Sequence, residues 1–242
     1  MIKKNYLENL NNSKKPFIIY RSNKGFDLYT DFSKKIILTK NNIERFINQS
    51  TKIKSKKKET DLFIGFFGYE VLNNLIGIKV KKQKGLKFPK GIFYKPETKQ
   101  KLPNKLNYKN LEIIKSNTLF KININRASYK IIFDKFKKKI KSGETYQIKI
   151  CTKYSNKTQI DALDFFCRLV RSNMAPEAFM IKDKDYSIIS CSPENLINKK
   201  NNFITTKPIA GTLKKTKKLN KIKALAFFKK NIKESKEHNM IV

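Results

Sequence analysis

The spacing of apolar residues predicts a chain that contains both helices and strands. Between residues 127 and 140, apolar side chains recur every three or four positions, which places them on one face of a helix. The pair Ser142-Gly143 then ends that helix. Similar spacing predicts helices over 42–49, 160–170 and 219–242.

Strands are predicted where apolar and polar residues alternate or where short apolar runs occur. Residues 145–154, TYQIKICTKY, alternate strictly, so that Tyr146 and Ile148 face one side and Gln147 faces the other. A hairpin is predicted around the KDKD turn of residues 178–192. Shorter apolar runs predict strands at 17–20, 35–39, 61–70 and 203–207, and the polar stretch 99–110 is typical of a connector.

The composition is that of a folded domain with a strongly basic surface. Hydrophobic residues make up 39% of the 242 residues, which is enough for a sizeable core, and the formal net charge is +36. Of the 55 basic residues, 50 are lysines spread along the whole chain, and lysine is accompanied by many Asn and Ile residues. An AT-rich coding sequence produces this mixture without selection for charge. A non-catalytic basic protein that binds RNA or protein is the alternative interpretation.

The cysteines and the apolar runs predict a cytoplasmic protein. The three cysteines, Cys151, Cys167 and Cys191, are an odd number without metal-binding spacing, as expected for reduced thiols. The first residues, MIKKNYLENLNNSKK, lack the apolar segment of a signal peptide. The longest apolar run, at 62–68, is too short to cross a bilayer, so we expect no membrane partner.

Four short motifs could carry chemistry, and each also has a simple structural explanation. They are GETYQIKI (143–150), SPEN (192–195), KPIAGT (207–212) and KESKEHNMIV (233–242). Ser192 followed by Pro193 is typical of a helix start. Gln147 could be an ordinary outward-facing strand residue, and Glu234 and Glu237 could belong to a solvated helix face. The sequence contains no Gly-rich phosphate loop and no Cys/His zinc cluster.

Taken together and in this order, the four motifs resemble those of the chorismate-utilising enzymes. That family includes the synthase components of anthranilate synthase and aminodeoxychorismate synthase, and the isochorismate and salicylate synthases. The resemblance covers residues 126–242 most clearly, and GFFGYE at 65–70 is similar to an N-terminal stretch of the family. It implies an α+β fold with stacked antiparallel sheets flanked by helices. It also implies an N-terminal region at 1–115 and the first half of a catalytic domain at 116–242.

The resemblance implies a role for several residues. Glu194 would be the general acid that protonates the leaving 4-hydroxyl of chorismate. Gly211 and Thr212 would contact the substrate. Glu237, with Glu234 as a second candidate, would bind the Mg²⁺ that neutralises the ring carboxylate, because hard oxygen ligands suit this ion.

Two positions imply that the nucleophile is ammonia. Gln147 stands where the water-adding members of the family carry a lysine base, and an amide cannot take up a proton. Ala210 stands where many aminodeoxychorismate synthases carry a lysine that attacks ring carbon 2. We therefore expect free ammonia, delivered by a glutamine amidotransferase subunit, and anthranilate as the product. The absence of a Leu-Leu-Glu-Ser stretch keeps aminodeoxychorismate open as the alternative product.

The resemblance also implies that these 242 residues hold an incomplete site. The family pattern continues beyond EHNMIV into a second half with a further Mg²⁺ ligand and an arginine that binds a substrate carboxylate. We therefore expect that this polypeptide alone is inactive.

Overall fold

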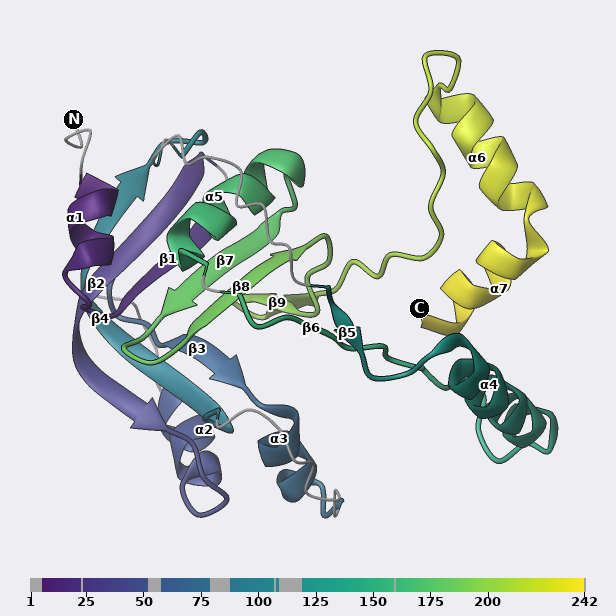
Figure 1. The fold of residues 1–242 in the computed structure, drawn as a ribbon, viewed down its shortest axis with the longest axis horizontal. Helices are drawn as coiled ribbons and strands as arrows, with labels where there is room; N and C mark the ends of the chain where they lie inside the picture. The colour runs from purple at the N-terminus through teal and green to yellow at the C-terminus, as the bar shows by residue number, and fades with distance from the viewer. Residues whose placement is uncertain are drawn as a thin grey trace. The chain divides into compact units, whose positions relative to one another are not determined.

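A computed structural model describes residues 6–22, 24–51, 58–78, 88–106, 108, 119–158 and 160–241 (Figure 1). The chain divides into two compact units. One unit comprises Met1–Tyr108 and Phe165–Val242, and the other comprises Lys109–Asp164.

The first unit is built on a six-stranded antiparallel sheet with the strand order β3-β4-β2-β1-β7-β8. Because β1 pairs with β7, the sheet joins strands that are about 160 positions apart in the sequence, as the register Tyr20↔Phe179 shows. The sheet strands are β1 (Phe17–Ser22), β2 (Gly25–Ile37), β3 (Ile64–Phe67), β4 (Gly91–Leu102), β7 (Glu177–Lys182) and β8 (Ser187–Ser192). A separate two-stranded ribbon pairs β9 (Asn198–Lys200) with β10 (Phe203–Thr205).

The core of this unit lies on the sheet, where strand residues that alternate in sequence meet on one face. One cluster of buried side chains spans four strands and consists of Ile18, Tyr29, Ile92, Tyr94 and Ile181. A second cluster joins the end of β2 to helices α2 (Ile43–Thr51) and α3 (Tyr69–Leu75), and consists of Leu38, Ile43, Phe46 and Val71. Helix α1 (Tyr6–Asn12) contributes the buried Leu7.

Helix α5 (Ala162–Ser172) buries the face that the sequence predicts to be apolar. Phe166 is fully buried, and its ring meets that of Phe26 on β2 edge-on, with the ring centroids 5.9 Å apart. The other buried residues of that face are Leu163, Cys167 and Val170. The predicted helix therefore forms, and it packs on the sheet.

The second unit contains helix α4 (Arg126–Lys141) and the short pair β5 (Lys121–Ile122) with β6 (Tyr154–Ser155). Asn125 caps α4, because its Oδ1 accepts the amide hydrogen of Ser128 at 2.8 Å. The helix ends at Ser142-Gly143, where Gly143 adopts a left-handed φ of +78°. No residue of α4 is buried, although its apolar face is well formed.

The strand predicted over 145–154 is wrong for all but its last residue. Only Tyr154 and Ser155 pair with another strand, and Tyr146 is 78% exposed. Alternation makes a segment suitable for a sheet, but a strand needs a neighbour that satisfies its backbone groups. In the part of the chain that the structure describes, this segment has such a neighbour only at β5.

Three smaller predictions also need correction. Ser192 ends β8 and is followed by a bend rather than a helix. The connector predicted at 99–110 is partly wrong, because β4 continues to Leu102. The helix predicted over 219–242 is two helices, α6 (Lys221–Lys230) and α7 (Ile232–Ile241), which meet at an extended Asn231. The division at residue 115 stays a prediction. Among the residues described, no helix combines the length and the hydropathy needed to cross a bilayer.

Candidate active site

The loop after β10, Pro208–Thr212, is the centre of the candidate site. Gly211 has a left-handed φ of +76°, which L side chains rarely adopt. A Cβ atom at this position would lie 2.6 Å from Glu234 Oε2 and 2.8 Å from Phe228 Cε1. The backbone conformation therefore favours glycine, and a larger residue would displace Glu234 or Phe228. Ala210 and Gly211 are half-buried, and Thr212 is exposed.

Glu194 reaches this loop from the segment that follows β8. Its Oε1 accepts the backbone N–H of Ile209 at 2.9 Å. The Ser192 hydroxyl accepts the N–H of Glu194 at 3.3 Å and donates to the Glu194 carbonyl at 3.1 Å. These bonds form a local Ser turn without a helix. The structure thus joins two of the predicted motifs, SPE and PIAGT, through a direct hydrogen bond.

Helices α6 and α7 supply the other contacts with the loop. Asn231 ends α6, and its side chain accepts the Glu234 N–H at 3.3 Å at the start of α7. Glu234 is 18% exposed, and its Oε1 forms an ion pair with Lys233 Nζ at 3.3 Å. Its other oxygen, Oε2, points toward Gly211.

Glu237, the main predicted metal ligand, lies on the same helix as Glu234. Glu237 is half-buried and follows Glu234 by three residues, which places the two carboxylates about one turn apart. His238 is exposed. Within the described residues, no three or more His, Cys, Asp or Glu side chains gather as a metal-binding group.

Gln147 belongs to the second unit. Its side chain is exposed, and its backbone carbonyl accepts a hydrogen bond from the Thr145 hydroxyl at 3.2 Å. Among the predicted residues, the structure brings Glu194, Ala210, Gly211 and Glu234 into one region. Gln147 is not placed among them.

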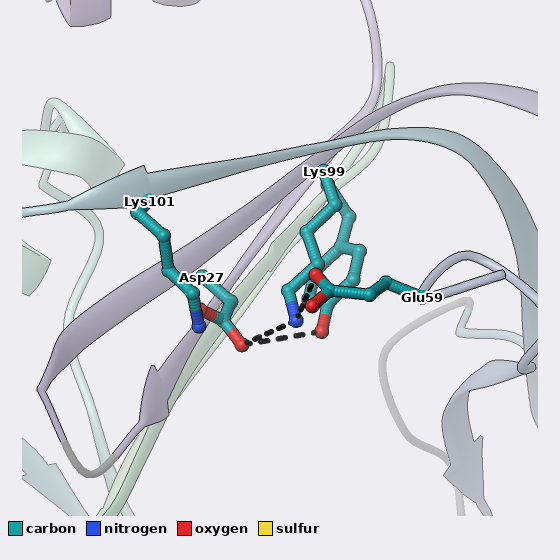
Figure 2. Close-up of polar contacts among 5 residues, drawn as sticks. Asp27, Glu59, Lys99 and Lys101 are labelled. Carbon is teal, nitrogen blue, oxygen red and sulfur yellow. Dashed lines mark hydrogen bonds and ion pairs between the residues drawn. The ribbon is translucent and has the colours of Figure 1, made fainter.

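A charged cluster that the sequence pattern did not predict lies on the sheet of the first unit. Asp27 of β2 is 7% exposed and pairs with two lysines of β4. The distances from Asp27 are 2.5 Å to Lys101 Nζ and 3.3 Å to Lys99 Nζ, and Lys99 also pairs with Glu59 at 3.0 Å. Figure 2 shows Lys99 between the two carboxylates. The signal that could have revealed the cluster is an aspartate within the otherwise apolar GFDLY stretch of 25–29.

The pairing changes the pKa values of both partners. Burial acts to raise the pKa of Asp27, but hydrogen bonds from Lys101 and Lys99 outweigh it and lower the pKa below its ordinary value. For Lys99, burial acts to lower the pKa, and the bonds to Glu59 and Asp27, with the nearby charges, raise it. The cluster is therefore held in its charged form at neutral pH, which is consistent with a structural role.

A comparison with protein families matches residues 5–242 to the family described as chorismate binding enzyme. Because this match covers nearly the whole chain, the protein belongs to that family. The family resemblance seen in the four motifs is confirmed, and the α+β fold with antiparallel sheets is confirmed by the structure.

The similar curated proteins come from two groups within the family. Aminodeoxychorismate synthase component 1 of Bacillus subtilis is 33% identical over 110 residues, which cover 45% of this chain and 23% of the relative. Anthranilate synthase component 1 of Buchnera aphidicola subsp. Pemphigus spyrothecae is 27% identical over 242 residues, covering 82% of this chain and 46% of the relative. Anthranilate synthase component 1 of Saccharomyces cerevisiae is 31% identical over 131 residues, which cover 53% of this chain and 26% of the relative. These matches span less than half the length of each relative.

Proposed function

We propose that this chain contributes the general acid and the substrate loop of an enzyme that aminates chorismate at ring carbon 2 with ammonia. The observation that carries the proposal is the hydrogen bond between Glu194 Oε1 and the N–H of Ile209. It holds the proposed acid at the loop that contains Ala210 and the two proposed substrate contacts, Gly211 and Thr212. Family membership and the names of both groups of relatives support chorismate as the substrate.

Glu194 is suited to assist the departure of the 4-hydroxyl group. A hydroxyl leaves only when it receives a proton, and a carboxylic acid can supply that proton. The N–H of Ile209 holds one carboxyl oxygen, so the other oxygen is left to deliver the proton. This bond also orients the carboxylate that remains after the proton has moved.

Ammonia is the nucleophile that agrees best with the two diagnostic positions. Neutral ammonia needs no base, so the amide of Gln147 is sufficient where a water-adding enzyme would need a lysine. The methyl group of Ala210 cannot attack ring carbon 2. Since several relatives are named component 1, we propose that a glutamine amidotransferase subunit delivers the ammonia.

Anthranilate is the proposed product of amination at ring carbon 2. Aminodeoxychorismate, in which the amino group replaces the hydroxyl at ring carbon 4, is the second candidate. The relative named anthranilate synthase component 1 from Buchnera aphidicola matches along 82% of this chain, and Ala210 favours free ammonia. The shorter match of higher identity, to a relative named aminodeoxychorismate synthase component 1, supports the second candidate.

Magnesium is the proposed metal, and Glu237 is its proposed ligand, with Glu234 as the second candidate. Two carboxylates one turn apart on α7 provide the hard oxygen ligands that this ion prefers. Mg²⁺ is commonly bound by one or two carboxylates together with water and substrate oxygens, so a sparse protein ligand set fits it. When bound, the ion would neutralise charge on the ring carboxylate.

The test is turnover by the product of the complete reading frame that contains these 242 codons. The protein would be incubated with chorismate, ammonium and MgCl₂, and the products analysed by mass spectrometry. Anthranilate accompanied by pyruvate supports the first product, and aminodeoxychorismate without pyruvate supports the second. Glu194→Gln is expected to lower kcat at least about 100-fold, the usual contribution of a general acid.

Two outcomes would contradict the proposal. A hydroxylated product would show that water, rather than ammonia, is the nucleophile. The absence of chorismate turnover, together with RNA binding that weakens steeply with salt, would favour the basic binding protein instead.

A further inference from the structure

We propose that Phe228 and Glu234 are positioning residues that hold the 208–212 loop at Gly211, two residues along from the bond between Ile209 and Glu194. The role of this loop in binding chorismate rests on the proposed function. The contacts that hold the loop do not.

Gly211 lies close to side chains of the two C-terminal helices. The 2.6 Å and 2.8 Å that separate a hypothetical Cβ from Glu234 Oε2 and Phe228 Cε1 are shorter than real Cβ contacts. Gly211 is therefore in van der Waals contact with a carboxylate and an aromatic ring. Two different side chains thus limit where its backbone can lie.

A turn between α6 and α7 brings these two side chains together. Phe228 is on α6 and Glu234 is on α7, and Asn231 between them is extended, with φ −86° and ψ 96°. The Ser235 hydroxyl donates to the Phe228 carbonyl at 3.0 Å, which ties the two helices across the turn. The Asn231 side chain caps the start of α7 by accepting the N–H of Glu234 at 3.3 Å. Two hydrogen bonds thus hold the turn that presents Phe228 and Glu234.

Two neighbours orient the Glu234 carboxylate. Lys233 Nζ pairs with its Oε1 at 3.3 Å, and Oε2 lies against Gly211. Two residues earlier in the loop, Glu194 Oε1 accepts the N–H of Ile209 at 2.9 Å. Ala210 lies between these two attachments. Its position, and that of the neighbouring substrate-facing backbone, is therefore set by contacts at residues 209 and 211.

The experiment measures amide hydrogen exchange at Ile209 in the 242-residue chain without any ligand. Phe228→Ala and Glu234→Ala are each expected to speed exchange at Ile209 at least tenfold, because the loop can then move away from Glu194. Phe228→Tyr keeps the ring and should restore the slow exchange. Ile222→Ala is the matched control, since Ile222 lies on α6 with a side chain that is 77% exposed.

Unchanged exchange at Ile209 in both alanine variants would overturn the proposal, as would an equal effect of Ile222→Ala. The amide of Ile19 on β1 reports global unfolding in the same experiment. If Phe228→Ala also speeds exchange at Ile19, the variant Phe228→Leu is measured instead. Faster exchange of Ile209 alone in Phe228→Leu supports the proposal, and unchanged exchange of Ile209 overturns it.

A second measurement connects the contact with the substrate. Isothermal titration with chorismate and MgCl₂ should show at least fivefold weaker binding for Phe228→Ala and Gly211→Ala, and unchanged binding for Phe228→Tyr. In the double variant that combines Phe228→Ala with Gly211→Ala, removal of the ring relieves part of the clash at residue 211. The losses of chorismate affinity should therefore be less than additive. Full additivity would contradict the contact. If the unaltered chain does not bind chorismate, the substrate role of this chain fails, whereas the exchange measurement still decides the positioning role.

Discussion

Helices α4 and α5 have the same kind of sequence pattern and opposite surroundings. Both carry apolar residues at helical spacing, and both form where that spacing predicts. α5 buries Phe166 and its neighbours, whereas α4 leaves Tyr129, Phe133 and Ile140 each at least 40% exposed. The comparison teaches that periodicity specifies a helix and its apolar face. It does not specify whether another element covers that face.

The largest expected effect is on the buried helix. Phe166→Ala removes a fully buried ring that packs against Phe26, and should lower the free energy of unfolding by about 3–5 kcal/mol. Chemical denaturation followed by circular dichroism measures this change. Phe166→Leu, which keeps most of the volume, is the control and should cost much less. A loss below about 1 kcal/mol for the alanine variant would show that α5 does not pack on the sheet in solution.

The next largest effect is expected at the charged cluster on the same sheet. Asp27→Asn leaves Lys99 and Lys101 without their shared carboxylate, and should destabilise the protein by about 1–3 kcal/mol. Lys101→Ala is the matched control. Because the Lys101 side chain is 62% exposed, its loss should cost under about 1 kcal/mol. Equal losses for the two variants would contradict the structural role of the buried carboxylate.

Acid should weaken this sheet region. The pKa of Asp183 is lowered in the same way as that of Asp27. Burial acts to raise it, but hydrogen bonds from Lys35 and Tyr94 outweigh the effect of burial. Carboxylates with lowered folded-state pKa values stabilise the fold above the unfolded value of about 3.9, and this contribution is lost as pH falls below it. The raised pKa of Lys99 matters at alkaline pH. Its contribution to the free energy of unfolding is lost only as the pH rises beyond about 10.4.

The measurement is the midpoint of denaturation between pH 2 and 7. Asp27→Asn should flatten the acidic part of the curve, since the group that binds the proton is gone. The same acid dependence with and without Asp27 would show that this carboxylate is not the group that titrates.

The smallest effect is expected on the exposed helix. Phe133→Ala should change the free energy of unfolding by less than about 1 kcal/mol, because the ring is already 45% exposed and α4 buries no residue. The same denaturation experiment used for Phe166 gives the comparison. A loss as large as that of Phe166→Ala would show that another element covers the α4 face in solution.

The family was predictable because its signature depends on short motifs. The order of SPE, PIAGT and KExxEH predicted the family, which the comparison confirmed. The roles assigned to Glu194, Gln147 and Glu237 stay predictions. The sequence did not predict that Glu194 would bond to Ile209, nor that Phe228 would contact Gly211, because both contacts join residues 15 or more positions apart.

The sequence by itself determined where α2, α4, α5 and the β7–β8 hairpin form, because local periodicity, caps and turn residues act within one or two turns of chain. Only the tertiary structure decided that α5 is buried and α4 is not, and that 145–153 has no strand neighbour among the described residues. It also decided that Gly211 lies against Glu234 and Phe228. The physical reason is common to all three. Burial and strand pairing need a partner from elsewhere in the chain. A local sequence pattern indicates that a segment can be buried or paired, but it does not indicate which segment will be the partner.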